Sequence, residues 1–124
     1  MTENREKRAL IVEDSEDIAE LIEFVLQQEG YQCDKVDDGK TAFRMATTQK
    51  YTLLVVDVYL PNWNGVEMLN SLSMVQEPVP IIVCTGGNAA SISQDIENEH
   101  VIEVLQKPFE VPVFKDAVRR AESV

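Results

Sequence analysis

The sequence LLVVDVYLPNWNG, residues 53–65, decides the fold of this chain. Its first four residues are all apolar and turn-forming residues follow, a pattern that predicts a buried strand opening into a loop. The strand is expected to cover residues 53–57, so that Asp57 is its last residue. Fully apolar strands are typical of parallel sheets, and open α/β sheets carry their chemistry at the carboxyl ends of the strands. Asp57 is therefore the first candidate for a functional residue.

Strand and helix patterns alternate along the whole chain. Apolar runs predict further strands at residues 9–12, 31–36, 81–84 and 102–105. Helical spacing predicts a first helix that Ser15 can cap and Gly30 can end. Further helices are expected at 41–49, after Gly65, at 89–96 and at 113–121, and Asp38-Gly39 is expected to form a turn.

Five strand–helix repeats with short connections predict a parallel sheet with helices on both faces. The strands at 9–12, 53–57 and 81–84 are nearly all apolar and should be central. The strand at 31–36 is more polar and that at 102–105 is short, so both suit the edges. The expected fold is a flavodoxin-like (βα)5 doubly wound α/β sheet in the order 2-1-3-4-5. We expect one domain over residues 1–124, with a core of about 8–122 and no output domain.

The composition excludes several classes of function. A net charge of −11 argues against direct nucleic-acid binding and against an anionic membrane surface. The sequence has no apolar stretch long enough for a membrane span and no signal-peptide pattern, so a cytoplasmic protein is expected. Cys33 and Cys84 lack the spacing of a zinc site or a disulfide framework, and two small buried side chains are the favoured interpretation.

Acidic side chains follow two strands that the predicted order makes neighbours. Glu13 and Asp14 come after the strand at 9–12, and Asp57 ends the strand at 53–57. Three carboxylates placed so near one another need a positive charge to offset their repulsion. Ligand atoms that are all oxygen select a hard ion such as Mg²⁺. The alternative is that Asp14 and Asp57 cap the following helices. Capping does not explain a pair of acids at one strand end, so the metal site is favoured.

Two further strand ends carry groups that suit an anion. Thr85 follows the strand at 81–84 and offers a hydroxyl, and Lys107 follows the strand at 102–105 and offers a positive charge. Together with Mg²⁺, these groups could hold the oxygens of a phosphoryl group. The carboxylate of Asp57 would then be the nucleophile that forms an acyl phosphate.

At these residues the chain resembles the response-regulator receiver domains of two-component signalling. The resemblance covers essentially residues 8–122 and is carried by four blocks in order. They are LIV followed by Glu13-Asp14, VVDVYLPNWNG at 55–65, IIVCTG at 81–86, and QKPF at 106–109.

The resemblance implies a role for each matching residue. Asp57 would accept the phosphoryl group, and Thr85 and Lys107 would contact it and move on activation. Asp14 would bind Mg²⁺ directly, Glu13 would bind it through water, and the backbone carbonyl of Tyr59 would be a further ligand beside Asp57. The Lys107-Pro108 peptide bond is expected to be cis.

The chain departs from the family pattern on one side of this site. Val104 stands where the family usually has an aromatic ring that moves with the threonine, so we expect the signal to pass through loops or through the helix at 89–96. Tyr59 and Gly87 occupy positions that flank the phosphoryl group in the family. Tyr59 could shield it from water, whereas Gly87 leaves its own side open.

The function expected from these residues is a phosphorylation-dependent signalling switch, not an enzyme. A sensor histidine kinase or a phosphotransfer protein would supply the phosphoryl group, and an unknown downstream protein would read the changed surface. A free-standing domain, monomeric or forming a phosphorylation-linked homodimer, is expected. Two alternatives stay open: a pseudo-receiver interaction module with an inactive site, and an aspartate-nucleophile phosphatase.

Overall fold

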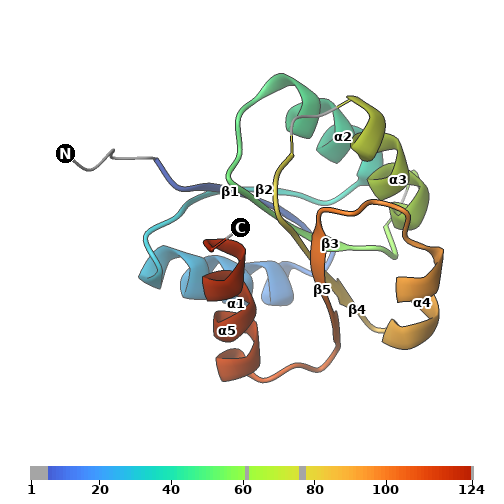
Figure 1. Cartoon of the computed structure of the whole chain (residues 1–124). Helices are drawn as coiled ribbons and strands as arrows, with labels where there is room; N and C mark the ends of the chain where they lie inside the picture. Colours follow the sequence, from blue (N-terminus) through green and yellow to red (C-terminus); the bar gives the residue numbers. More distant parts are fainter. Residues whose placement is uncertain (1–5, 61, 76–77, 124) are drawn as a thin grey trace.

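The computed structural model describes residues 6–60, 62–75 and 78–123, and contains one sheet and its covering helices (Figure 1). The strands all run parallel in the order β2-β1-β3-β4-β5, which confirms the predicted fold. In chain order the elements are β1 (Arg8–Val12), α1 (Glu16–Gln28), β2 (Gln32–Val36), α2 (Gly39–Thr48), β3 (Leu53–Asp57), α3 (Gly65–Val75), β4 (Ile81–Thr85), α4 (Ala89–Asp95), β5 (Val101–Gln106) and α5 (Val111–Ala121).

Helices cover both faces of the sheet because alternate side chains of a strand point to opposite sides. Ile11 and Val55 face α1 and α5 and pack with Phe114. Leu10 and Leu54 face α2, α3 and α4 in a second core. Every residue of β3 and β4 is buried, as expected for central strands covered on both sides.

The local helix signals are confirmed at α1 and corrected at α2. The Ser15 hydroxyl accepts a hydrogen bond from the Ile18 amide, and Gly30 lies just beyond the end of α1 with φ of 93°, which favours glycine. The predicted turn at Asp38-Gly39 is wrong. The Asp38 carboxylate accepts a hydrogen bond from the Thr41 amide at 2.8 Å, so it caps α2, which begins at Gly39.

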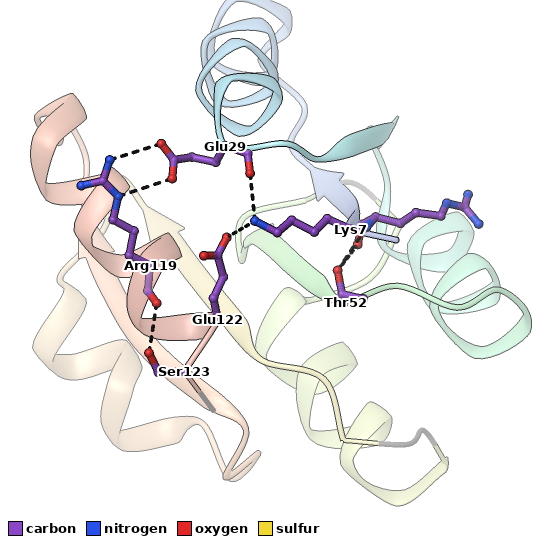
Figure 2. A network of polar contacts seen from close by, with 7 residues as sticks. Lys7, Glu29, Thr52, Arg119, Glu122 and Ser123 are labelled. Carbon is purple, nitrogen blue, oxygen red and sulfur yellow. Dashed lines mark hydrogen bonds and ion pairs between the residues drawn. The ribbon is translucent and has the colours of Figure 1, made fainter. Parts of the chain in front are cut away.

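A network of polar contacts lies at the amino ends of the strands, opposite to their carboxyl ends (Figure 2). The Lys7 ammonium lies 3.1 Å from the backbone oxygen of Glu29 and 3.1 Å from the carboxylate of Glu122. The Arg119 guanidinium contacts the Glu29 carboxylate at 3.4 Å. These contacts join the entry to β1 to the ends of α1 and α5. No helix among the described residues is long and apolar enough to cross a membrane.

Candidate functional site

The carboxyl ends of four adjacent strands bring the predicted residues to one edge of the sheet. Glu13 and Asp14 follow β1, and Asp57 ends the neighbouring strand β3. Thr85 ends β4, which pairs with β3, and Lys107 directly follows β5. The parallel register explains the grouping, because every strand delivers its last residue to the same side.

The carboxylates of Glu13, Asp14 and Asp57 form a compact cluster that could hold a cation. One oxygen from each lies within 4.8 Å of the others. The Glu13 and Asp57 side chains are buried, with residue exposures of 4% and 5%, whereas Asp14 is exposed and leaves the cluster open to solvent. All the ligand atoms are oxygen, which suits Mg²⁺, and a buried group of like charges needs such a neutralising ion.

Helix capping, the alternative use of these acids, is performed by other residues. Ser15 caps α1, and the Asn64 carboxamide oxygen accepts a hydrogen bond from the Val66 amide at 2.9 Å at the start of α3. One oxygen of Asp57 accepts instead from the amide of Tyr59 at 2.9 Å. One oxygen of Glu13 accepts from the Ser15 amide at 3.1 Å, and the remaining oxygens of Glu13 and Asp57 contact Lys107.

Lys107 joins the two buried acids. Its ammonium lies 2.7 Å from Oε1 of Glu13 and 3.1 Å from Oδ2 of Asp57. Burial alone would lower the pKa of Lys107, but the hydrogen bonds and charges of the two carboxylates outweigh it and raise that pKa. Burial raises the pKa of Glu13, and the bond to Lys107 only partly opposes this. The bridge is therefore an ammonium shared between two acids.

Thr85 forms the inner wall on the β4 side. The residue is fully buried, and its hydroxyl oxygen accepts a hydrogen bond from the Gly87 amide at 3.0 Å. Its backbone oxygen accepts from the Lys107 amide at 2.7 Å, which ties β4 to the start of the Lys107-Pro108 segment. The Lys107-Pro108 bond is cis, as expected. The Thr85 hydroxyl proton is free to be donated to a ligand.

Tyr59 and Gly87 meet at the rim of the site. The Tyr59 side chain is exposed, and its ring lies so close to Gly87 that a Cβ added there would overlap the hydroxyl oxygen and come within 2.8 Å of Cε2. A larger residue at position 87 would have to displace this ring. Ligation of a cation by the Tyr59 backbone carbonyl stays a prediction.

Sequence reasoning missed Gln106. Its carboxamide accepts a hydrogen bond from the Ala89 amide at 2.9 Å and donates one to the Gly87 backbone oxygen. A polar residue ending a largely apolar strand, directly before Lys107, was the available signal. Val104 is partly buried against the α2–α4 side of the sheet, at the space between α4 and β5.

The family model of the response regulator receiver domain matches residues 9–119 of this sequence. The chain belongs to this family. Sporulation initiation phosphotransferase F of Bacillus subtilis is 26% identical to it over 114 residues, which are 92% of each chain. Receiver domains are phosphoacceptor signalling domains that interact with histidine kinases or phosphotransfer proteins and with downstream targets.

Solved structures of receiver domains share the fold and carry a metal. The receiver domain of a sensor histidine kinase from Pseudomonas aeruginosa is 27% identical to this chain, with a TM-score of 0.83. The match covers 97% of this chain and 100% of that one, and a magnesium ion is coordinated in the active site cleft of that structure. The response regulator TrrA of Thermotoga maritima, solved in complex with Mg²⁺-BeF, is 26% identical, with a TM-score of 0.78 and coverages of 93% and 98%. The cluster of Glu13, Asp14 and Asp57 offers this receiver domain the ligands for such an ion.

Proposed function

We propose that this receiver domain accepts a phosphoryl group on Asp57 and thereby changes its protein-binding surface. The observation that carries the proposal is the Lys107 ammonium, which contacts both Glu13 and Asp57 at the edge where Asp14 and Thr85 also lie. A carboxylate oxygen of Asp57 attacks the phosphorus of a phosphohistidine on a sensor histidine kinase or phosphotransfer protein. The P–N bond breaks, and the imidazole nitrogen leaves with the bonding electrons and takes up a proton.

The other residues would stabilise the charge of the transferred group. Lys107 is close enough to Asp57 to contact a phosphoryl oxygen bound there, and the Thr85 hydroxyl can donate a hydrogen bond to another. Glu13, Asp14, Asp57 and the Tyr59 carbonyl are the proposed holders of Mg²⁺. When bound, the ion would supply positive charge to the phosphoryl oxygens.

The test is the intact mass of the protein after incubation with acetyl phosphate and Mg²⁺. We expect the wild type to gain one phosphoryl group and Asp57→Asn, which keeps the size of the side chain, to gain none. A chelator should abolish the gain in the wild type. An unmodified wild type would favour a pseudo-receiver, and continuous hydrolysis of phosphate esters would favour a phosphatase.

We also propose that the domain is cytoplasmic, that it acts as one receiver domain, and that a separate protein reads its surface. Its net charge of −11 disfavours self-association through any acidic face. We propose a monomer, or a homodimer that forms only on phosphorylation. Light scattering with and without acetyl phosphate and Mg²⁺ distinguishes the two, and a constant dimer would contradict both.

A further inference from the structure

Gly87 is held on three sides by side chains from three different elements. Its amide donates to the Thr85 hydroxyl at 3.0 Å, and its backbone oxygen accepts a hydrogen bond from the Gln106 carboxamide. The ring of Tyr59 occupies the place where a side chain of residue 87 would begin. One residue therefore contacts the end of β4 through its amide, the end of β5 through its backbone oxygen, and the loop after Asp57.

Gln106 also holds the first residue of α4. Its carboxamide oxygen accepts a hydrogen bond from the Ala89 amide at 2.9 Å, so the two ends of the segment 87–89 are fastened to one side chain. Gln106 is exposed and stands beside Lys107 at the end of β5. The side chain thus links the proposed phosphoryl site to the start of α4.

The opposite end of α4 is anchored to α3. The Asn70 carboxamide donates to the backbone oxygen of Asp95 at 3.2 Å and accepts from the amide of Glu97 at 2.7 Å. Buried Asn98 donates to the backbone oxygen of Leu69 at 2.8 Å. The end of α4 is therefore tied to α3 by side-chain hydrogen bonds. At its start, before Ile92 packs into the core, Gln106 supplies the hydrogen bond that joins the first residue of the helix to β5.

Between α4 and β5 lies an open space of about 460 Å³, lined by Ala90 and Ser93 on one side and by Ile102 and Val104 on the other. The short side chain of Val104 does not fill this space. A helix fixed at one end can turn into it without displacing a large side chain. Figure 1 shows α4 beside β5, at the same end of the sheet as the loop that follows β4.

We propose that Gln106 is a positioning residue that couples the Thr85 hydroxyl to α4. The inference rests on the proposed function, because Thr85 must turn toward a phosphoryl group on Asp57. When the hydroxyl turns, the Gly87 amide loses its acceptor and the backbone of Gly87, including its carbonyl, reorients. The bonds from Gln106 to Gly87 and Ala89 then break, and α4 swings about its anchor on α3. The signal reaches the surface without a ring at position 104.

Two amide protons report on the two halves of this link. The Gly87 amide is bonded to Thr85, and the Ala89 amide is bonded to Gln106. We would measure their hydrogen exchange by NMR in wild type, Thr85→Val and Gln106→Ala. Thr85→Ser, which keeps the hydroxyl, and Gln32→Ala, on the other edge strand, are the matched controls.

If Thr85 and Gln106 are coupled, replacing either residue should change hydrogen exchange at the amide that is bonded to the other. Thr85→Val should speed exchange at Ala89, and Gln106→Ala should speed exchange at Gly87, each by about fivefold, the factor expected for loss of one hydrogen bond. The controls should exchange as the wild type does. If each substitution changes only its own amide, Gln106 merely supports the loop and the inference is wrong.

A second arm uses beryllium fluoride with Mg²⁺ as an analogue of the phosphoryl group. In the wild type the analogue should speed exchange at both amides. Gln106→Ala should bind the analogue about fivefold more tightly, because the hydrogen bonds of Gln106 hold α4 in its resting position and oppose the active state. Unchanged exchange in a protein that binds the analogue would overturn the coupling. If the wild type binds no analogue, the proposed function fails, and the exchange of the two amides in the variants still decides the coupling.

Discussion

Lys107 makes the resting site stable as well as reactive. Its ammonium contacts Glu13 and Asp57, both almost fully buried, and so offsets part of the repulsion between them. A phosphoryl group on Asp57 would bring further negative charge to the same ammonium. The lysine can therefore exchange a carboxylate partner for a phosphoryl oxygen with little movement.

The raised pKa of Glu13 predicts a pH dependence of stability. In the folded protein, burial favours its protonated form relative to the unfolded chain, where the pKa is 4.5. Without divalent ions, the free energy of unfolding should therefore decrease as the pH rises from about 4.5 through the raised pKa. Glu13→Gln should flatten this part of the curve.

Urea unfolding in a chelator at a series of pH values measures the effect of Glu13→Gln. The pKa of Lys107 is raised above 10.5, so this group titrates at a higher pH than the range over which Glu13 loses its proton. The effects of the two groups on stability can therefore be separated. Asp14→Asn is the matched control, because Asp14 is exposed. A Glu13→Gln curve parallel to that of the wild type would show that Glu13 does not titrate differently on folding.

Tyr59 predicts how long a phosphoryl group on Asp57 survives. Its ring covers Gly87 at the rim of the site and would restrict the approach of water. Tyr59→Asn should therefore shorten the lifetime of the phosphorylated protein severalfold, measured as the decay of the phosphorylated mass after the phosphodonor is removed. Tyr59→Phe keeps the ring and should decay at the wild-type rate. Equal rates for all three proteins would reject shielding.

Local sequence signals predicted the elements well and the contacts between elements poorly. An apolar run predicts the strand at 53–57, and a glycine predicts the end of α1 at Gly30. Asp38-Gly39 was misassigned because the same residues suit a turn and a helix cap. Only the fold reveals that Asn98 is buried against α3.

The same limit explains which parts of the site the sequence could predict. Glu13, Asp57 and Lys107 were identifiable because strand order places their strand ends together. The sharing of one ammonium by two acids depends on side-chain conformations that no spacing specifies. The position of Gln106 at the end of an apolar strand was visible in the sequence, but its partners are backbone atoms, which no residue type identifies.

The hydrogen bonds that hold the end of α4 predict that two asparagines contribute unequally to the free energy of unfolding. Asn98 is buried and donates to the Leu69 oxygen, so Asn98→Ala leaves that oxygen and the amide of His100 without their partner. We expect a loss of about 2 kcal/mol in the free energy of unfolding. Asn70→Ala exposes its backbone partners to water and should cost less than about 1 kcal/mol. Urea titrations compare the two, and equal losses would contradict the assignment of Asn98 as the main anchor.

At the scale of the whole molecule, the two poles of the sheet have different polar chemistry. At the amino ends of the strands, Lys7 contacts Glu29 after α1 and Glu122 after α5, and so joins the residues that enter β1 to both helices (Figure 2). At the opposite end of the sheet three carboxylates lie together, and one lysine contacts two of them, so the cluster is short of positive charge. The acidic pole is therefore the part of the molecule whose stability a cation should change.

Mg²⁺ should accordingly stabilise the folded protein. An ion that binds only the folded state adds about 2.7 kcal/mol at a hundred times its dissociation constant. Because the net charge is −11, any salt also relieves repulsion, so NaCl at equal ionic strength is the necessary control. Thermal unfolding should show a rise with Mg²⁺ in the wild type that NaCl does not reproduce. Asp14→Asn, which removes an exposed ligand, should lose most of this rise, and an equal rise in that variant would place the ion elsewhere.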